Sequence, residues 1–487
     1  MTDAQAAERH KWLALALLAT TQFVIVLDAA IVNVAIPSIG RDLHFAQENL
    51  TWIPNAYALT FGGFLLLGGR MADLLGRRRL FMAGLVLFSL ASLLGGLSVN
   101  EGQLIAARAV QGLGAALLAP SALSMVTNMF TEGAERNKAL GVWGAVSGSG
   151  GAAGVLLGGV LTQYAGWEWV LWVNVPIGVI AAILAPRLLV ESRKEAETKT
   201  FDAFGALTVT AGLSLLVYGL VDTVNSGWGS SKTLLLLAAA AALLAVFVVT
   251  ELRSRAPLMP FRIFRLRTLT GANVIGLLVG ASVFAMFFFL SRYMQQVLGY
   301  DALKAGLSYL PLALAIIVSA GVASQLVTKL GFKPVLLAGM ALVTVALLWF
   351  AQVPVDGSYV TDLLAPMVIA AVGLGFAFVP MTIAAVSNIS ADDSGLASGL
   401  INTSQQVGGA LGLAILGTMA SSRTTHLLTA AHGDPSAVPA ALTEGFQRAF
   451  LAGAGFGILG IIATLVLIRG SDSRAIVGAK PAELPLT

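Results

Sequence analysis

The chain has 487 residues, of which 57% are apolar and 11% are charged, and its formal net charge is +4. An ordinary soluble domain carries about 25% charged residues, so this composition excludes a soluble globular protein and predicts an integral membrane protein. The chain has no cysteine, which excludes disulfides, thiolate metal sites and cysteine nucleophiles. Its uncharged runs of about 18 to 25 residues match helices that cross about 30 Å of hydrocarbon, whereas β-barrel strands would be shorter and would alternate.

Apolar runs bounded by charged or turn residues predict fourteen membrane-spanning helices, so both chain ends face the same side. With the N-terminus inside, most of the 29 lysines and arginines fall on cytoplasmic segments, as the positive-inside rule requires. No small-residue cleavage site follows the first run, so we expect that run to stay in the protein. The predicted helices lie near 12–37, 50–69, 80–99, 102–129, 138–164, 168–189, 203–222, 233–252, 268–291, 305–328, 333–353, 362–388, 395–421 and 447–469.

Two charged stretches divide these helices into two groups of six with a pair between them. The second group resembles a copy of the first, because Gly76 and Arg78 align with Gly331 and Lys333 after the second helix of each group. The predicted segments are a cytoplasmic N-terminus 1–11, a six-helix half 12–190, a cytoplasmic linker 191–202, an inserted helix pair 203–252, a basic linker 253–267, a second six-helix half 268–470 and a cytoplasmic tail 471–487.

The first helix carries a carboxylate, Asp28, inside an apolar run. A charge at the bilayer centre costs about 2.5 to 3.5 kcal/mol, so such a residue suggests a function. Counted along the helix, Asp28 lies about 12 Å from the outer surface, and Arg108 of the fourth helix lies about 9 Å below it. Two residues that form an ion pair must lie at similar depths, as these two do. Proton coupling and a permanent salt bridge between the two helices both fit these positions.

The stretch "GRMADLLGRRR" joins the second and third helices and combines Gly69, Asp73, Gly76, Arg77 and Arg78. A small residue lets helices approach closely, and an acid can lie against a helix N-terminus or pair with an arginine. These contacts would form in one conformation and break in another, which predicts a gate. The alternative is a topology anchor made by positive charge alone.

The fifth helix is rich in glycine, and Gly150, Gly154 and Gly158 share one face at a spacing of four residues, followed by Gly159. Such a face permits close helix packing, and the spacing alone predicts nothing beyond that.

Several side chains are candidates for a substrate cavity inside the spans. Amides can line a polar cavity or bond a neighbouring helix, and aromatic rings can face substrate, lipid or core. None of the four histidines lies in a predicted span, so no histidine relay is expected. The cavity candidates are Asn33, Tyr57, Gln111, Phe284, Phe288, Asn402 and Gln406.

Six stretches, taken together, are highly specific: "LDAAIVNVAIP", "GRMADLLGRRR", "RAVQGLGAA", the glycine run of the fifth helix, "WEWVLWVNVPIG" and "GLASGLINTSQQVGGALG". They resemble the fourteen-helix drug/proton antiporters of the major facilitator superfamily, and the similarity covers nearly the whole chain. The resemblance implies an all-α major facilitator fold. It also implies proton coupling by Asp28 and Arg108, a cytoplasmic gate after the second helix, and a pliant interface between the halves formed with the glycines of the fifth helix.

The chain departs from the family pattern at three positions. Leu74 stands where an arginine is common, Val155 where a proline is usual, and Gln405 where an arginine is frequent. The missing charges predict a weaker ionic latch and a less polar thirteenth helix.

We expect a proton-coupled antiporter that exports lipophilic drugs or antibiotics by alternating access and that is not an enzyme. The alternatives are a symporter or lipid flippase on the same fold and a non-transporting membrane sensor. No P-loop is present, and we expect no cofactor and no metal, with the proton as coupling ion. The expected partners are a lipophilic small molecule, protons and membrane lipid, without nucleic acid. The expected state is a monomer in the cytoplasmic cell membrane.

Overall fold

A computed structural model describes residues 3–45, 49–50, 52–192, 202–254, 257–387, 389–390, 393–432 and 434–474, and every regular element in these ranges is a helix. Most of the predicted linker 191–202 and of the predicted tail 471–487 lie outside them. The first group of helices is α1 (Asp3–Asp42), α2 (Trp52–Leu75), α3 (Arg77–Gly96), α4 (Glu101–Met129), α5 (Ala134–Tyr164), α6 (Trp169–Trp172) and α7 (Asn174–Leu188).

The inserted pair is α8 (Ala203–Ser226) and α9 (Ser231–Arg253). The later helices are η1 (Phe261–Arg265), α10 (Arg267–Arg292), η2 (Tyr293–Val297), α11 (Ala302–Ser308), α12 (Leu310–Leu330), α13 (Phe332–Phe350), η3 (Tyr359–Leu364), α14 (Ala365–Val386), α15 (Ser394–Ala430), η5 (Pro435–Ala437), α16 (Val438–Leu467) and α17 (Gly470–Arg474).

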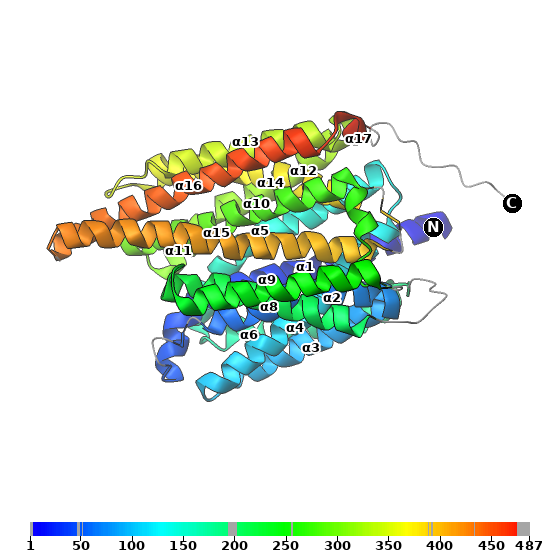
Figure 1. Ribbon diagram of the computed structural model, residues 1–487, viewed down its shortest axis with the longest axis horizontal. Coiled ribbons are helices and arrows are strands. Elements are labelled where there is room, and N and C mark those ends of the chain that lie inside the picture. The colour runs from blue at the N-terminus through cyan, green and yellow to red at the C-terminus, as the bar shows by residue number, and fades with distance from the viewer. Residues whose placement is uncertain are drawn as a thin grey trace.

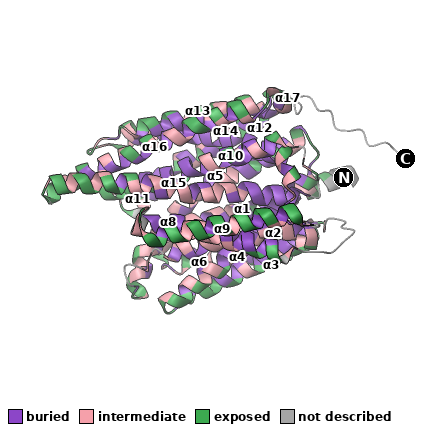
Figure 2. Ribbon diagram, viewed as in Figure 1, coloured by how far each residue is buried: buried purple, intermediate pink, exposed green. Residues whose placement is uncertain are grey.

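The long helices lie side by side in one bundle, and α1 begins at the end of the bundle where α16 and α17 finish (Figure 1). We call this the basic end, because Arg70, Arg77, Arg78 and Arg79 lie there, where α2 ends and α3 begins. Figure 2 shows buried residues where helices face one another and many exposed residues along α9. Exposed apolar side chains on α9, such as Leu235, suit a lipid surface better than water.

Thirteen helical segments among the described residues are long and apolar enough to cross a membrane. The helix α15 is not among them, although it is 37 residues long and lies within the bundle. Its amides and glycines lower its hydropathy. The chain is therefore a multi-pass helical membrane protein, and the count of fourteen stays a prediction.

The helices α1 to α7 pack mainly on one another, as do α10 to α16. Contacts between these two groups run through α2 and α4 against α15 and through α5 against α11, α12 and α14. The inserted helix α8 packs on both α2 and α15. This arrangement places the inserted pair along one of the two seams.

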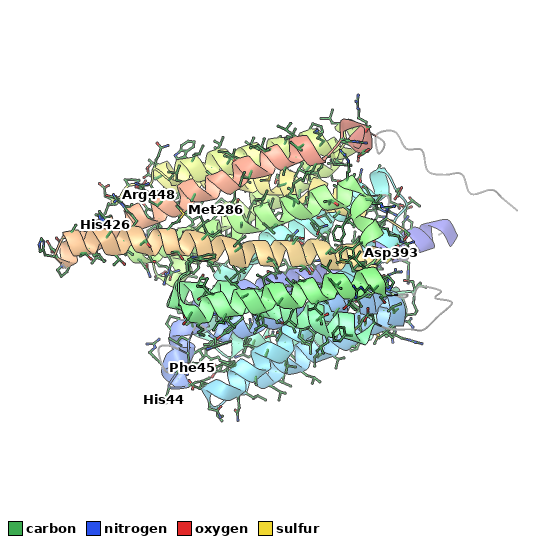
Figure 3. The ribbon with its side chains drawn as sticks, in the orientation of Figure 1. His44, Phe45, Met286, Asp393, His426 and Arg448 are labelled. Atoms are coloured by element: carbon green, nitrogen blue, oxygen red, sulfur yellow. The ribbon has the colours of Figure 1, made fainter. Side chains whose placement is uncertain are left out.

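Helix ends extend beyond the predicted spans, because a helix does not stop where the hydrocarbon stops. The span predicted at 395–421 belongs to a helix that continues to Ala430 and carries His426 on its exposed end, so this histidine is helical and not in a loop. Figure 3 shows His426 and Arg448 far from the basic end and Asp393 near it. The sixth predicted helix is interrupted at Val173, so that Asn174 begins a new helix.

Candidate functional site

An aspartate and an arginine meet inside the first group of helices. Asp28 lies on α1 and Arg108 on α4, and their side chains are 0% and 1% exposed. Nη1 of Arg108 lies 2.7 Å from Oδ2 of Asp28. The two helices run in opposite directions, and the depth of each residue was counted by helical rise from the outer end of its own helix. The two residues lie at the same level, as that count predicts. The contact that the sequence left open is present.

Two amides and a hydroxyl complete the surroundings of this pair. Nε2 of Gln111 and Nδ2 of Asn174 both donate to Oδ1 of Asp28, at 2.7 and 2.8 Å. The hydroxyl oxygen of Ser92 accepts from the same two amides, at 2.6 and 3.4 Å. We call Asp28, Arg108, Gln111, Asn174 and Ser92 the buried charge network.

Further contacts hold the guanidinium group of Arg108. Its Nε donates to the carbonyl oxygen of Ile53 at 3.3 Å, and its Nη1 donates to Oε1 of Gln111 at 2.5 Å. Its central carbon lies 4.4 Å from the ring centre of Tyr57, in the geometry of a cation–π contact. Tyr57 and Gln111, both cavity candidates, are thus placed against Arg108.

The packing of the buried charge network depends on the charge of Asp28. A buried ion pair loses the hydration of both charges, and it is stable only when the two groups and their remaining donors are well paired. Three N–H groups point at the Asp28 carboxylate. A proton on Asp28 would leave Arg108 as a buried charge without its anion. Proton binding here would therefore change the packing between α1, α4 and α7.

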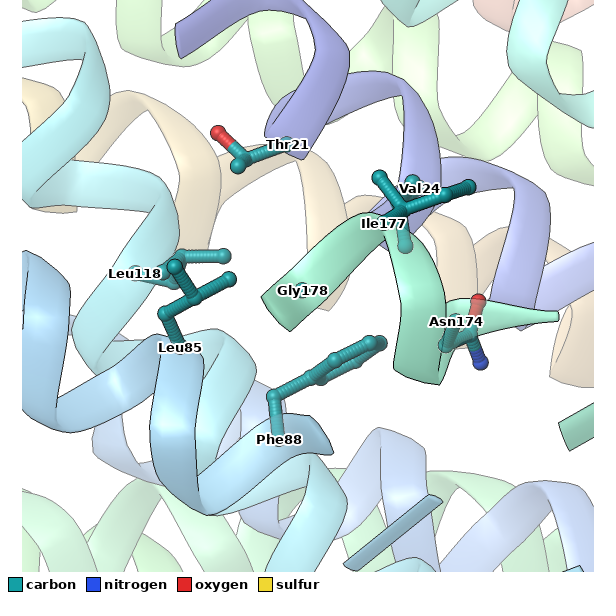
Figure 4. Close-up of a pocket in the computed structure, with 8 residues that line it drawn as sticks. All are labelled: Thr21, Val24, Leu85, Phe88, Leu118, Asn174, Ile177 and Gly178. Atoms are coloured by element: carbon teal, nitrogen blue, oxygen red, sulfur yellow. The ribbon is translucent and has the colours of Figure 1, made fainter. Parts of the chain in front are cut away.

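A small cavity lies beside the network and is lined by residues of α1, α3, α4 and α7 (Figure 4). Asn174 is part of its wall, and Oδ1 of Asn174 has no hydrogen-bond partner among the described residues. The other lining residues are Thr21, Val24, Leu85, Phe88, Leu118, Ile177 and Gly178.

Asp73 joins the two groups of helices at the basic end. It is fully buried, and its Oδ1 and Oδ2 accept the backbone N–H groups of Gly395 and Leu396, each at 3.0 Å. These N–H groups belong to the first turn of α15, where the helix dipole favours an anion. Nη2 of Arg77 also donates to Oδ1 of Asp73 at 2.7 Å. The two contacts predicted as alternatives for Asp73 occur together.

Three further polar contacts surround this junction. Nη1 of Arg70 lies 3.9 Å from Oδ1 of Asp393. The hydroxyl of Ser394 bonds Ser124 at 2.6 Å and accepts from the amide of Asn128 at 2.9 Å. Side chains of α2 and α4 thus hold the start of α15. We call these contacts, with those of Asp73, the gate contacts.

The remaining gate candidates have distinct places. A Cβ on Gly69 would lie 2.4 Å from the carbonyl oxygen of Gly395, so α2 and α15 approach as closely as only glycine allows. Gly76 has φ of 110°, which favours glycine in the turn between α2 and α3. Arg78 instead donates to the carbonyl oxygen of Leu189, which follows α7 in the same group of helices. The side-chain contacts of Arg78 with described residues thus stay within the first group of helices.

The glycines of α5 correct one expectation. Gly150, Gly154 and Gly158 were expected at the interface between the halves, but they pack on α1; a Cβ on Gly154 would lie 2.6 Å from the carbonyl oxygen of Leu27. Gly159 is buried. A second set of α5 glycines faces the other group of helices, namely Gly141, Gly144 and Gly148. The reason is that α5 has two glycine faces, and spacing alone does not say which neighbour each one meets.

Five cavity candidates lie away from the buried charge network. Asn33 and Asn402 donate to backbone carbonyls one turn earlier on their own helices. Phe284 is exposed and packs on Gly409, and Phe288 is exposed beside the guanidinium group of Arg292. Gln406 lies near Gly62 at the contact of α15 with α2. Their role in substrate binding stays a prediction.

Sequence reasoning missed Asn174 and Ser92 as members of the network. Asn174 carried a usable signal, because it is an amide in an apolar run, two residues before Pro176. Ser92 carried none, since serine is common in membrane helices and bonds its own backbone.

Comparison with known proteins agrees with this architecture. The family model described as Major Facilitator Superfamily matches residues 18–413. The cephamycin export protein CmcT of Amycolatopsis lactamdurans is 41% identical over 457 residues, covering 93% of this chain and 92% of that protein. The puromycin resistance protein pur8 of Streptomyces alboniger is 37% identical, covering 95% and 92%. The crystal structure of the human organic anion transporter MFSD10 superimposes with a TM-score of 0.63 at 13% identity, covering 95% of this chain and 100% of that one.

Proposed function

Because this chain belongs to the major facilitator superfamily and is therefore a membrane transporter and not an enzyme, we propose that it exports small antibiotic-like molecules in exchange for protons. The observation that carries the proposal is the Asp28–Arg108 pair, which is buried in a helix bundle and held by several hydrogen bonds. Two buried charges in a membrane helix are costly and are kept where they serve a function. The relatives whose names refer to cephamycin export and puromycin resistance support export as the direction.

The proposed cycle uses the two groups of helices as rocking halves. A proton from the outer side binds Asp28, Arg108 loses its anion, and α1 shifts against α4 and α7. The gate contacts at the basic end, which we place in the cytoplasm on the positive-inside rule, separate when the halves rock. Moving one charge through about 100 mV provides about 2.3 kcal/mol, enough for roughly a forty-fold substrate gradient per proton.

The test is a transport assay in proteoliposomes of the full chain with an imposed pH gradient. The compounds are a cephamycin, puromycin and a lipophilic monocation such as ethidium. We expect at least one of them to move against the proton flow, and the internal pH to change with it. Uptake in the same direction as protons would indicate a symporter, and movement that ignores the gradient would rule out proton coupling.

A further inference from the structure

Asn174 stands apart within the buried charge network, because it touches Asp28 from a third helix. It is 1% exposed, and it begins α7 just after the break at Val173. Pro176 lies in the first turn of α7, where its missing N–H removes no helix hydrogen bond. The amide lies toward α1, where Nδ2 lies 2.8 Å from Oδ1 of Asp28.

The three groups that donate to Asp28 differ in what else they do. Arg108 carries the compensating charge, and Gln111 both donates to Asp28 and accepts from Arg108. Asn174 donates to Asp28 and to Ser92, and its own oxygen has no partner among the described residues. An N–H group that donates to a carboxylate favours the ionised form over the protonated acid.

We propose that Asn174 is a positioning residue that sets the pH at which Asp28 takes up its proton. This inference rests on the proposed function, in which Asp28 is the proton carrier. Replacing Asn174 by an apolar residue of similar size would remove one donor from the carboxylate, so Asp28 would bind its proton at a higher pH.

The other titratable groups around Asp28 do not interfere with a measurement of this change in pH. Arg108 from α4 and Tyr57 from α2 are the titratable groups that face it, while α3 contributes Ser92 and α5 contributes the backbone beside Gly154. A tyrosine ordinarily titrates near pH 10 and an arginine above pH 12. A titration between pH 4 and pH 9 therefore reports on Asp28.

The experiment is an infrared pH titration of the full chain in lipid, following the carbonyl band of a buried protonated carboxylic acid. Loss of the band in Asp28→Asn assigns it. We expect Asn174→Leu to raise the midpoint of that band by about one pH unit, the size of one hydrogen bond to a charged group. Leucine has the same number of side-chain heavy atoms as asparagine and branches at the same carbon, so it is a near match in shape.

Ser92→Ala is the matched control, because Ser92 bonds the two amides and not the carboxylate. We expect it to move the midpoint by less than half as much. An unchanged midpoint in Asn174→Leu overturns the inference and leaves Asp28 as carrier. If no band between pH 4 and pH 9 disappears in Asp28→Asn, the proposed proton carrier itself is wrong.

The inserted helix pair carries a second, independent inference. The pair touches α2 at two levels: Trp52 stacks on Tyr218 at 5.5 Å, and a Cβ on Gly63 would lie 2.1 Å from Oγ of Ser214. These levels are about 17 Å apart along α2. The linker that follows α9 adds a third contact, because Arg70 donates to the carbonyl oxygen of Pro257 at 3.2 Å.

The contact of the pair with α15 is of another kind. At the basic end it consists of apolar side chains in a cluster that includes Val209 and Leu400 and that also contains Leu66 of α2. At the opposite end the described residues form a hydrogen bond from Nε1 of Trp228 to Oγ1 of Thr418, at 3.1 Å. The close approach of α2 and α8 at Gly63 resists sliding, whereas apolar side chains and a single hydrogen bond can exchange partners. We infer that α8 and α9 move as part of the first half and slide over α15 when the halves rock, so that they keep one seam covered.

This second inference also rests on the proposed alternating access, and distances between spin labels test it. The chain has no cysteine, so introduced cysteines are the only labelled sites. One pair is Trp52→Cys with Tyr218→Cys, and the other is Trp228→Cys with Thr418→Cys. A reference pair joins Leu75 and Leu330, exposed residues at the ends of α2 and α12.

Between pH 5 and pH 8 we expect the reference distance and the 228–418 distance to change while the 52–218 distance stays fixed. If the reference distance changes and the 228–418 distance does not, the inference is wrong. A reference distance that is the same with and without a pH gradient would count against alternating access itself, and with it the sliding motion.

Discussion

The interiors of the two halves differ in one respect that bears on mechanism. The first half buries Asp28 and Arg108 among amides and a hydroxyl. In the second half, the buried charged residue among those described is Asp393, which lies just before α15 at the gate contacts and not inside a helix of the bundle. The polar contact between its helices α10 and α15 is neutral, from the hydroxyl of Ser404 to Oδ1 of Asn273 at 2.7 Å.

This difference indicates that the two halves have different roles, although a symmetric repeat would give them the same one. A buried charge pair is costly and rarely more stable than apolar packing, so its presence in one half alone points to chemistry and not to stability. A neutral amide and hydroxyl are inexpensive and can hold helices or line a cavity. We infer that the first half responds to protons and that the second half follows through the gate contacts.

The change expected to have the largest effect is Asp28→Asn. The amide keeps the shape of the side chain and removes the proton site and the negative charge. We expect gradient-driven transport in proteoliposomes to fall by about two orders of magnitude or more. The amount of folded protein and its elution volume should match the wild type. If Asp28→Asn transports at the wild-type rate, the buried charge of the first half does not distinguish its role from that of the second half.

Arg108→Lys comes next. Lysine keeps the charge but lacks the planar fork that reaches Asp28, Gln111 and the carbonyl oxygen of Ile53 together. We expect transport to fall by roughly ten-fold or more, with a smaller loss of thermal stability than in Arg108→Ala. The measurements are initial transport rate and melting temperature. Normal transport in the lysine variant would show that the charge of Arg108 has only a structural role.

Part of this network is accessible to sequence reasoning, and the reason is geometric. Helical rise is fixed, so the depths of Asp28 and Arg108 follow from counting once the helix directions are known. The position of Asp73 at a helix junction follows from its loop. In contrast, the angle of a residue around its helix depends on neighbours that the sequence does not specify.

Two misplaced or missed features show this limit. Asn174 meets Asp28 at the start of α7, and the direction in which this side chain faces depends on how α7 packs on α1. The glycines of α5 form two faces, and the more regular one packs on α1 and not on the second half. Small residues indicate close packing without naming the partner.

The gate contacts are tested by Gly69→Ala, which should have an intermediate effect. The new Cβ would lie 2.4 Å from a backbone carbonyl oxygen of α15, which cannot move as a flexible side chain could. We expect the gate at the basic end to close poorly and transport to fall by about five-fold to ten-fold. Thiol labelling of a cysteine placed at Leu75 should become faster.

Gly151→Ala is the control for this change, because a Cβ there would meet nothing within 4 Å. An alanine in a helix is favoured over glycine by about 1 kcal/mol, so this variant should be as stable as the wild type or more stable. Equal losses of transport in the two variants would show that helix flexibility, and not the contact with α15, explains the effect.

The smallest effect is expected in the second half, from Asn273→Leu. The change removes the partner of Ser404, but that hydroxyl is only partly buried and can turn to a carbonyl of its own helix. The expected cost is about 1 kcal/mol of stability, seen as a slightly lower melting temperature, with transport within about twofold of the wild type. The pH dependence of transport should not move, because no titrating group is touched. A loss as large as that of Arg108→Lys, or a shifted pH profile, would place part of the proton chemistry in the second half.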